Sequence, residues 1–421
     1  MRDGGRIAAA IEVLDDMDQR HKPVRLALKA WGDGARYAGA KDRAFVSGLA
    51  LDVLRRRRSL AWAMGEEANR ARVLGALATL WGWDLPRIEA AAAEEHGPGA
   101  LTEAERTRLA DPGALAEAPA AVRGDYPDWA AASLERTFGQ AAGDELAALA
   151  ERAPVDLRAN TLKSDVAHVL KALETFGPQT SDLAANAVRI PAPAASERAA
   201  PVEASPAFER GWFEVQDIGS QVAAACAGEI KGKQVLDFCA GGGGKTLALA
   251  AAMGNTGQLY AYDADARRLT DTVRRSQRAG VRNLQVRSPI EKDPLRGLDG
   301  KMDLVFVDAP CTGSGTWRRH PDAKWRLSPE QLERRMAEQD AVLDGAAAFV
   351  KPGGRLVYVT CSLFAEENED RVAAFLARTP GFEAMPAAGV ADSFLTAAGY
   401  LRLTPRTAGT DGFFVAVLAR T

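Results

Sequence analysis

The second half of the chain alternates short apolar runs with amphipathic segments, and this alternation restricts the fold more than any other feature. The runs that predict strands are 235–238, 259–262, 284–286, 304–307 and 356–359. Strands that alternate with helices pair in parallel, with helices packed on both faces of the sheet. Two further runs, 400–403 and 413–418, surround a glycine-containing turn and are expected to add antiparallel strands at the edge. Residues 216–421 are therefore predicted to form an α/β domain with a doubly wound, Rossmann-like sheet.

A glycine-rich loop follows the first of these strands and reads Cys239-Ala240-Gly241-Gly242-Gly243-Gly244-Lys245-Thr246. A P-loop would need glycine at position 239, and a dinucleotide-binding fingerprint would need glycine at position 246, so neither motif is complete. Bare backbone in such a loop still lets a ligand approach closely. Asp263, at the end of the second strand, suits the two hydroxyls of a ribose. A nucleoside without a pyrophosphate fits both features, which favours S-adenosylmethionine as the ligand.

Two cysteines and an aspartate follow the fourth and fifth predicted strands. Asp308 and Cys311 come directly after the fourth strand, and Cys361 comes after the fifth. A lone Asp-Ala-Pro-Cys turn is as often a buried thiol as a reactive one, but these two strands are expected to be close, so the thiols should converge. A thiolate that adds to carbon 6 of cytosine makes carbon 5 able to accept a methyl group. Asp308 would hold the base, and Lys245 or an arginine would favour the thiolate.

Several motifs together resemble those of one enzyme family. They are 236–241 with 244–246, 308–315, 319–322, 360–362 with 366–368, and 411–414. This set is similar to the RNA cytosine-5 methyltransferases of the Sun-domain family, in their bacterial RsmB-like branch. Residues 6–55 resemble the NusB-like helical domain of that branch, and 156–162 and 211–221 match its next landmarks. The resemblance extends over nearly the whole chain.

The resemblance implies a role for each matching position. Cys361 would be the nucleophile, Cys311 would assist release of the methylated product, and Asp308 would bind the target cytosine; Lys245 joins them as a catalytic candidate. The implied contacts of S-adenosylmethionine are Cys239, Ala240, Gly241, Gly242, Gly243, Gly244, Lys245, Asp263 and Asp308. The chain departs from the family at two places. Its loop has four glycines where the family has Ala-Pro-Gly-Gly, and Arg287-Ser288 stands where the family has an Asp near the adenine.

The first 140 residues are predicted to form a helical, NusB-like, RNA-binding domain. Apolar side chains recur there at helical spacing, and prolines with nearby glycines mark the breaks between helices. Trp62, Trp81 and Trp83 stand at helical spacing beside Leu and Ala and are expected in the core. The run Arg55–Arg58 is expected to be a solvated cap at a helix end, and the alternative is that it faces phosphates.

Residues 141–215 are predicted to form a small α+β (RRM-like) domain. The segments 155–160 and 188–190 have the character of strands, and a helix is expected between them. Residues 191–206 are rich in Pro, Ala and Ser without periodicity, which is typical of a loop.

RNA is the expected partner, and a basic segment with tryptophans is its predicted contact. The net charge is −3, so the chain as a whole is not basic and RNA contacts must come from local patches. The candidate contacts after the active loop are Arg318, Arg319, His320 and Lys324, beside Trp317 and Trp325. We expect them to line the substrate cleft, and the alternative is ordinary surface charge. By analogy with the NusB-like domain, small-subunit ribosomal RNA is the favoured substrate.

Composition restricts the remaining possibilities. The 4 cysteines contain no CxxC pair, so neither a metal site nor a disulfide framework is expected, and the cytoplasm is the expected location. No apolar run approaches the length needed to span a membrane. The chain is expected to be a monomer. Three alternatives remain open. They are a noncatalytic RNA-binding or ribosome assembly factor on the same fold, the same chemistry on transfer RNA, and a DNA cytosine methyltransferase whose Pro-Cys thiol is the nucleophile.

Overall fold

The computed structural model describes residues 1–195 and 197–421, and contacts divide the chain into two compact units. The helical unit comprises Met1–Ala153, Ala192–Ala199 and Trp317–Leu327. The sheet unit comprises Pro154–Pro191, Ala200–Thr316 and Ser328–Thr421. Ser196, which belongs to the loop predicted over 191–206, lies outside the described residues. Within the described ranges, no helix combines the length and the apolar character needed to cross a membrane.

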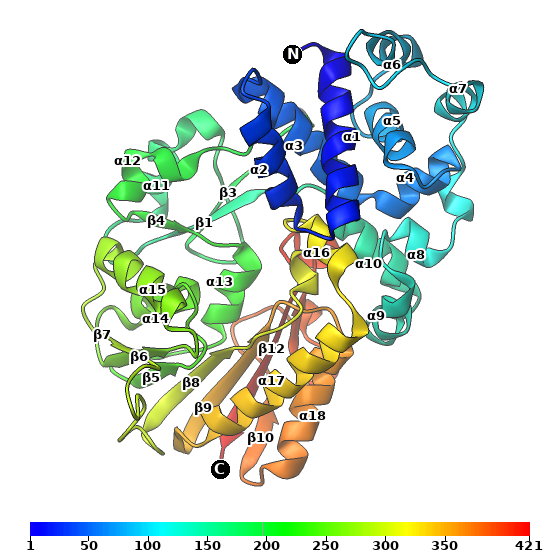
Figure 1. The fold of residues 1–421 in the computed structure, drawn as a ribbon. Coiled ribbons are helices and arrows are strands. Elements are labelled where there is room, and N and C mark those ends of the chain that lie inside the picture. Colours follow the sequence, from blue (N-terminus) through cyan, green and yellow to red (C-terminus); the bar gives the residue numbers. More distant parts are fainter. Residues whose placement is uncertain (196) are drawn as a thin grey trace. The chain divides into compact units, whose positions relative to one another are not determined.

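Helices build the first of these units, as the sequence predicted (Figure 1). They are α1 (Asp3–Arg20), α2 (Val24–Gly34), α3 (Ala40–Arg55), α4 (Arg57–Met64), α5 (Asn69–Thr79), α6 (Leu85–Ala92), α7 (Glu103–Ala110), α8 (Ala120–Arg123), α9 (Ala131–Phe138), α10 (Ala142–Leu149) and α16 (Pro321–Arg326). Short 3-10 turns are η1 (Leu115–Glu117), η2 (Asp128–Ala130) and η3 (Gly139–Ala141).

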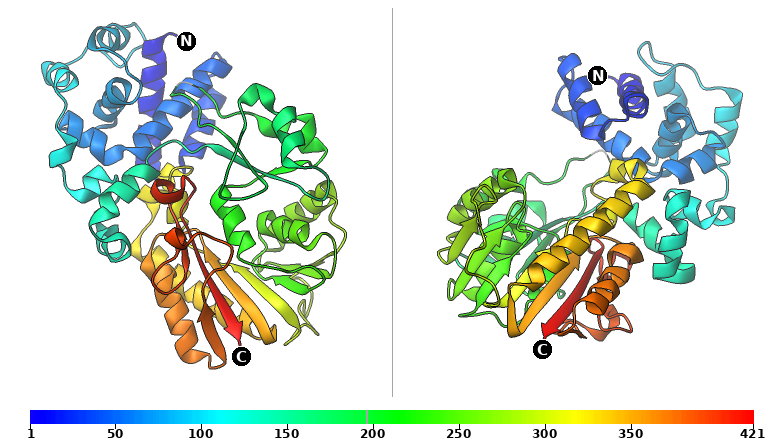
Figure 2. Two further views of the ribbon diagram at one scale, coloured as in Figure 1. Left: turned by 180° about the vertical axis from the view of Figure 1, so that it is seen from behind. Right: turned by 60° about the horizontal axis from the view of Figure 1, so that its bottom comes forward.

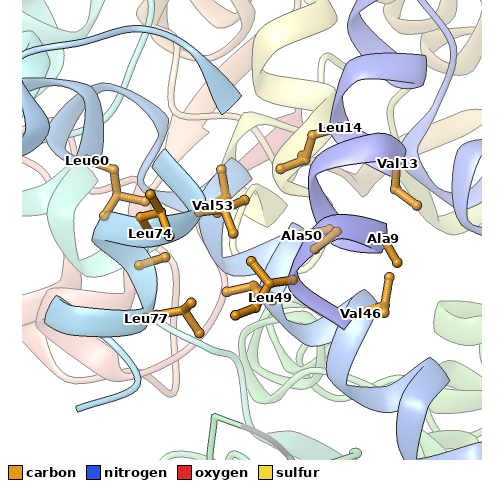
Figure 3. Close-up of a cluster of buried hydrophobic side chains, with 14 of the residues drawn as sticks. Ala9, Val13, Leu14, Val46, Leu49, Ala50, Val53, Leu60, Leu74 and Leu77 are labelled. Atoms are coloured by element: carbon orange, nitrogen blue, oxygen red, sulfur yellow. The ribbon is translucent and has the colours of Figure 1, made fainter. Parts of the chain in front are cut away.

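The core of the helical unit is made by apolar faces of α1, α3, α4 and α5 (Figure 3). Helix α3 contributes Val46, Leu49, Ala50 and Val53, which recur at i, i+3, i+4 and i+7 and are all buried. Leu14 of α1 belongs to the same cluster. Each buried leucine contributes about 2 kcal/mol. The amphipathic pattern of these helices therefore holds them together, since isolated helices of this length are marginal in water.

The three tryptophans expected in this core differ in burial. Trp83 is buried and Trp81 is half-buried, with its indole N–H donating to Asp52 Oδ2 at 2.9 Å. Trp62 departs from the prediction, because 39% of its surface is exposed. Its indole N–H donates to the carbonyl oxygen of Ala114 at 3.2 Å, which fixes the ring at the surface.

Helix α16 belongs to the helical unit although it lies far along the sequence. Lys324 Nζ donates to the carbonyl of Arg55 at 3.1 Å, and Trp325 Nε1 donates to that of Leu54 at 2.7 Å. The last carbonyls of a helix have no partner within the helix. Helix α16 thus supplies donors to the C-terminal end of α3.

The sheet unit begins with a small antiparallel sheet of order β2-β3-β1-β4. Its strands and helices are β1 (Val155–Ala159), β2 (Gln179–Thr180), β3 (Ala187–Ile190), β4 (Phe213–Val215), α11 (Val166–Ala172) and α12 (Pro206–Glu209), with 3-10 turns η4 (Glu174–Phe176) and η5 (Val202–Ala204). The strands expected at 155–160 and 188–190 both form. Leu157 and Val188, which are cross-strand partners, pack with Val169 of α11 in one buried cluster.

The large sheet has the order β10-β12-β9-β8-β5-β6-β7, and β11 pairs with β12. Its strands are β5 (Gln234–Asp237), β6 (Gln258–Tyr262), β7 (Leu284–Arg287), β8 (Met302–Asp308), β9 (Val350–Thr360), β10 (Phe382–Met385), β11 (Leu401–Leu403) and β12 (Phe413–Arg420). Strands β5 to β9 pair in parallel, and β10 to β12 add antiparallel pairs at one edge. The predicted Rossmann-like sheet with an antiparallel edge is therefore confirmed.

Strand β9 begins earlier than the sequence predicted. The expected start was residue 356, with Lys351–Gly354 as a stop between helix and strand. Instead the pairing with β8 shifts register between Met302 and Leu304, and Gly353 has a φ of +73°. Five steps along β9, from Val350 to Arg355, correspond to two along β8, and this irregular stretch accommodates a glycine in the left-handed region inside a longer strand.

Helices cover both faces of the large sheet (Figures 1 and 2). On one face α13 (Ile218–Ala225) and α14 (Gly244–Met253) pack on the sheet, and on the other α17 (Pro329–Ala347) and α18 (Glu369–Arg378) do so. Helix α15 (Ala266–Ala279) connects β6 to β7, and α19 (Pro405–Ala408) precedes β12, with short turns η6 (Ser314–Thr316), η7 (Ala365–Glu367) and η8 (Asp392–Phe394). The predicted capping box at the start of α17 is present: Ser328 Oγ accepts from the Gln331 N–H.

The strand order reverses between β5 and β8. From β5 the chain continues outward to β6 and β7, and it then returns to β8 on the other side of β5. In open α/β sheets the carboxyl ends of the strands at such a switch point bound the ligand crevice. The residues that follow β5, β6, β8 and β9 are therefore where a site is expected.

Candidate active site

The two predicted thiols meet at this edge of the sheet. Cys311 follows β8 and Cys361 follows β9, and these strands are parallel neighbours with Asp308 opposite Val359. The Sγ atoms of the two cysteines lie 3.5 Å apart, so the expected convergence is observed. The Gly315 N–H donates to the Cys361 carbonyl at 2.9 Å, which ties the loop after β8 to the end of β9.

The surroundings of Cys311 keep its thiol protonated. The hydrogen bond with Cys361, together with burial, raises the pKa of the Cys311 thiol well above its ordinary value, and the nearby charges of Cys361 and Glu367 add to this. At neutral pH, Cys311 is therefore a protonated thiol that can donate a proton.

Lys245 and Asp308 form an ion pair beside the thiols. Lys245 stands in the first turn of α14, and its Nζ lies 2.7 Å from Asp308 Oδ2. The lysine side chain is 9% exposed and that of Asp308 33%. Burial lowers the pKa of Lys245, but Asp308, which accepts its hydrogen bond, and Cys361 outweigh burial and raise that pKa above its ordinary value. Lys245 is therefore a persistent cation next to the carboxylate and close to Cys361.

The glycine-rich loop is fastened to α15. Thr272 Oγ1 donates to the Gly241 carbonyl at 2.9 Å, and Arg275 Nη1 donates to the Gly242 carbonyl at 2.5 Å. Gly243 has a φ of +83°, and a Cβ there would lie 2.9 Å from Thr272 Oγ1. Glycine is needed at this position both for the backbone conformation and for the close approach of α15.

Asp263 lies next to the loop at the end of β6. Its Oδ2 accepts from the Gly241 N–H at 2.8 Å and its Oδ1 from the Asp265 N–H at 2.8 Å, while Arg268 Nη1 lies 3.5 Å from Oδ2. A carboxylate offers about four acceptor positions, so capacity remains for a hydroxyl. The Arg268 side chain is 62% exposed. The bare loop and this carboxylate together fit a nucleoside.

A second aspartate, Asp237, ends β5 below the loop, and no role was predicted for it. It is fully buried, and Thr246 Oγ1 donates to its Oδ2 at 2.6 Å. Its Oδ1 has no hydrogen-bond partner among the described residues. Burial raises the pKa of the Asp237 carboxyl to about 7. The signal in the sequence that could have identified Asp237 as a site residue is its position at the carboxyl end of a predicted strand.

Glu367 connects the two thiol loops and was also missed. This buried carboxylate accepts from the Thr312 N–H at 2.8 Å, from Gln339 Nε2 at 2.9 Å, and from the hydroxyls of Thr312 and Ser362. Thr312 follows Cys311, and Ser362 follows Cys361. Burial raises the pKa of Glu367, although four donors favour its charged form. The sequence contained Glu366-Glu367-Asn368 after the second thiol, but it could not show which side chain turns inward.

The predicted RNA contacts are only partly accessible. Arg318 is 4% exposed and Lys324 is 2% exposed, because both pack into the helical unit, where Lys324 caps α3. Burial lowers the pKa of Lys324 to about 8. Arg318 and Lys324 were predicted to line the substrate cleft, but both are buried. Arg319 is half-buried and His320 is exposed, so these two remain candidates for an RNA contact.

Cys239 and Ala240, predicted beside the cofactor, begin the loop after β5. Burial raises the pKa of Cys239 well above its ordinary value, so this thiol stays protonated. Among the residues that the structure describes, no group of three or more His, Cys, Asp or Glu side chains could hold a metal ion.

The fold and this arrangement of loop, carboxylates and thiols define a Rossmann-like methyltransferase. Residues 228–419 match the model of the 16S rRNA methyltransferase RsmB/F family, and 126–197 match the ferredoxin-like domain of RsmF/B-like methyltransferases. The chain belongs to the RsmB/F family of 16S rRNA methyltransferases. The ferredoxin-like match begins before the small domain predicted over 141–215 and ends within it.

Curated relatives agree with this assignment. The chain is 32% identical over 308 residues to the probable ribosomal RNA small subunit methyltransferase B of Synechocystis sp., covering 70% of this chain and 67% of the relative. It is 32% identical over 288 residues to ribosomal RNA small subunit methyltransferase B of Enterobacter sp., covering 65% of each. The chain thus spans about two thirds of the length of these relatives.

Solved structures show the same fold. The protein PH0851 covers 99% of this chain and 99% of its own, with a TM-score of 0.72 and 26% identity. A methyltransferase homologue from Pyrococcus horikoshii covers 72% of this chain and 98% of its own, with a TM-score of 0.60 and 27% identity. NSun6 from Pyrococcus horikoshii, whose structure includes SFG, shares the fold at 21% identity with a TM-score of 0.62, covering 70% of this chain and 98% of its own.

Proposed function

We propose that this chain transfers a methyl group from S-adenosylmethionine to carbon 5 of a cytosine in RNA, through a covalent bond between Cys361 and the base. The observation that carries the proposal is the pair of thiols 3.5 Å apart beside the Lys245–Asp308 ion pair. A methyltransferase that acts on an already nucleophilic atom has no need of either thiol. The family of rRNA methyltransferases to which the chain belongs supports RNA as the substrate class.

The proposed cofactor site is the glycine-rich loop with Asp263. The loop, from Cys239 to Lys245, contains four successive glycines whose backbone carries no side chain of its own, and Asp263 would accept hydrogen bonds from the ribose hydroxyls. Asp308 ends β8, the strand that pairs with β5 at the point where the strand order reverses. It would lie near the cofactor as well as near the base. When bound, S-adenosylmethionine supplies an electrophilic methyl group on a sulfonium.

Cys361 would act as the nucleophile. Its thiolate forms a bond from Sγ to carbon 6, and the electron pair of the 5,6 double bond moves to carbon 5 and makes it nucleophilic. The Lys245 ammonium, which is paired with Asp308, would stabilise the negative charge of the thiolate. After methylation, carbon 5 loses its proton to solvent, the pair from that C–H bond restores the double bond, and the bond from Sγ to carbon 6 breaks with its electron pair returning to the sulfur.

Asp308 and Cys311 would serve the base and the release step. The Asp308 carboxylate, held by Lys245, would hold the polar edge of the cytosine and orient its ring toward Cys361. Cys311 stays protonated, because its hydrogen bond with Cys361 and its burial raise its pKa, so it can share a proton with the departing Cys361 sulfur. Glu367 would hold both loops so that the two sulfurs stay adjacent.

Small-subunit ribosomal RNA is the proposed substrate, and bisulfite sequencing of RNA from cells with and without the gene tests it. We expect one cytosine of that RNA to lose its protection from bisulfite conversion when the gene is deleted. The wild-type gene should restore that protection, and a gene carrying C361A should not. If the cytosine that loses protection lies in a transfer RNA instead, the proposed reaction would stand and transfer RNA would be the substrate. If no cytosine changed, the proposal would be wrong and a noncatalytic role on the same fold would replace it.

A further inference from the structure

The glycine-rich loop of the proposed cofactor site is held by side chains from outside the loop. Arg275 of α15 donates from Nη1 to the Gly242 carbonyl at 2.5 Å, and Thr272 of the same helix donates to the carbonyl before it. Glycine has more backbone freedom than any other residue, so four in succession would lose much conformational entropy if a ligand had to order them. Contacts that order the loop in advance therefore raise the affinity that it can reach.

Arg275 is itself held by a carboxylate of the small antiparallel sheet. Strand β4 lies beside α15 (Figure 1), and its Glu214 accepts from Arg275 Nε at 3.2 Å and from Nη2 at 2.9 Å. The Glu214 side chain is 3% exposed and that of Arg275 is 21% exposed, so this pair is little screened by salt. With one edge on Glu214 and Nη1 on the loop, the planar guanidinium is fixed in one orientation.

Glu214 is bound through both of its carboxylate oxygens. Its second oxygen, Oε1, accepts from Arg278 Nη2 at 2.5 Å, one turn further along α15. Glu214 is also the cross-strand partner of Arg158 of β1. Removal of Arg275 alone therefore leaves Glu214 paired with Arg278, so that no buried charge is left without a partner.

A second contact connects the small sheet to the same loop. Gln216, directly after β4, accepts from Arg158 Nε at 2.7 Å through its Oε1. Its Nε2 donates to Ser220 Oγ at 3.1 Å and, at the longer distance of 3.4 Å, to the Gly244 carbonyl. Side chains of α15 and of the small sheet thus both bind carbonyls of the glycine-rich loop.

We infer that the small sheet takes part in cofactor binding, because Glu214 holds Arg275 and Arg275 holds the glycine-rich loop in the conformation that receives the cofactor. Arg275 and Glu214 are positioning residues that act through the loop. The inference rests on the proposed function in one respect, namely that this loop binds S-adenosylmethionine. The alternative is that the same contacts only fasten α15 to the small sheet. In that case the affinity of the folded protein for the cofactor would not depend on them.

Binding of S-adenosylhomocysteine, the product that S-adenosylmethionine leaves after methyl transfer, tests the inference. Its Kd for the full chain is measured by isothermal titration calorimetry. We expect R275Q to raise this Kd about tenfold, because the ligand itself must then order the loop. The matched control is R274Q, since Arg274 is the neighbouring arginine of α15 but is 78% exposed and pairs with Asp271 of the same helix. Equal affinities of R275Q and R274Q would overturn the inference.

A substitution within the loop separates positioning from a structural role. A Cβ at Gly242 would have one neighbour within 4 Å, Arg275 Nη1 at 3.7 Å, and Gly242 is not in the left-handed region. Alanine there reduces the freedom of the loop without restoring any contact with Glu214. We expect G242A to lower the Kd of R275Q about threefold and to leave the Kd of the wild type nearly unchanged. If G242A did not lower the Kd of R275Q, Arg275 would not act by ordering the loop and the inference would be wrong.

The variant E214Q tests the connection to the small sheet. We expect E214Q to raise the Kd about threefold, because a neutral amide holds Arg275 less firmly than a carboxylate does. The double variant E214Q/R275Q should bind no more weakly than R275Q, since Glu214 acts through Arg275. If the two effects were additive, Glu214 would act independently and the inference would be overturned. Urea unfolding shows whether each variant is folded, and E214D replaces E214Q if the latter is not.

Failure of this inference is distinguishable from failure of the proposed function. Methyl transfer to 16S rRNA is measured on the same preparations. If the wild type methylates carbon 5 of a cytosine while R275Q and the wild type bind S-adenosylhomocysteine equally, the inference is wrong and the proposed function stands. If the variants bind as expected but no cytosine is methylated, the inference stands and the proposed function is wrong. If the wild type does not bind S-adenosylhomocysteine, both are wrong.

Discussion

The Sγ atoms of Cys311 and Cys361 lie 3.5 Å apart, on loops that follow two adjacent parallel strands. Hydrogen bonding to Cys361 and burial raise the pKa of Cys311. A pair of thiols with one held protonated fits a reaction in which one sulfur attacks and the other supplies a proton when the first departs.

Exchange of each thiol for alanine should separate these roles. We expect C361A to abolish methylation and to capture no RNA, because no sulfur remains to attack carbon 6. We expect C311A to accumulate a covalent protein–RNA complex, because release of the Cys361 sulfur loses its proton donor. Denaturing gel electrophoresis with labelled RNA measures both. The matched control is C226A, whose buried thiol has its pKa raised to about 12 by burial and takes no part. Capture by C361A but not by C311A would reverse the assignment.

Mild oxidation should link the same two cysteines. Hydrogen peroxide would take one hydrogen from each thiol, form the Sγ–Sγ bond and leave two waters, which requires the sulfurs to approach from 3.5 Å to about 2.05 Å. We expect methylation to be lost as the bond forms and to return with dithiothreitol. Peptide mapping by mass spectrometry locates the bond. If oxidation inactivated the protein while Cys311 and Cys361 remained unlinked, their proximity would not be the cause.

Replacement of Glu367 by Gln should loosen the two thiol loops. Its carboxylate accepts four hydrogen bonds, and the amide NH₂ of Gln would face donors instead of accepting from them. We expect a loss of about 1–3 kcal/mol in the free energy of unfolding, measured with urea. We also expect slower peroxide-driven linkage of Cys311 to Cys361 in the folded protein, which a loss of stability alone would not produce.

The control for this variant is E333Q, because Glu333 is an exposed glutamate on α17. E333Q should change neither the free energy of unfolding nor the linkage rate. If E367Q were less stable yet its thiols oxidised at the wild-type rate, Glu367 would support the fold without positioning the sulfurs.

Asp237 should make stability depend on pH. Its pKa is raised from 3.8 to about 7 by burial, so the folded state keeps the proton where the unfolded state has lost it. The stability that this group contributes is fully present below pH 4 and is lost as the pH rises to 7. D237N keeps an oxygen for Thr246 and cannot ionise. Relative to the wild type, D237N should therefore gain about 3 kcal/mol between pH 5 and pH 8. Urea unfolding at both pH values measures the free energy of unfolding of the two proteins. If the difference between D237N and the wild type were the same at pH 5 and pH 8, the prediction would be wrong.

The architecture could be predicted from the sequence because periodic patterns of apolar residues indicate its helices and strands. The strands 235–238, 259–262 and 304–307 are apolar because the parallel strands β5, β6 and β8 are covered on both faces. The pairing of β8 with β9 then places Cys311 beside Cys361. Strand β9 was predicted too short, since Pro352-Gly353-Gly354 is typical of a break, and only the pairing of Val350 with Met302 shows that the strand begins before it.

The residues that the sequence could not place are those whose partners lie far along the chain. Glu367 is one of several acidic residues after Cys361, and only the folded loops show that it turns toward Thr312 and Ser362. Lys324 stood in a basic segment that resembled an RNA contact, yet its partner is a carbonyl of α3. A charged residue in a surface-like context says little about burial until its tertiary partner is known.

Helix α16 has a consequence for the order in which the protein is made. The carbonyls of Leu54 and Arg55 receive their donors from Trp325 and Lys324, 271 and 269 positions later in the chain. A ribosome releases the N-terminal helices long before it has synthesised those donors. The helical unit is therefore completed only after most of the sheet unit has emerged, and a fragment that ends at Ala153 lacks one of its own helices.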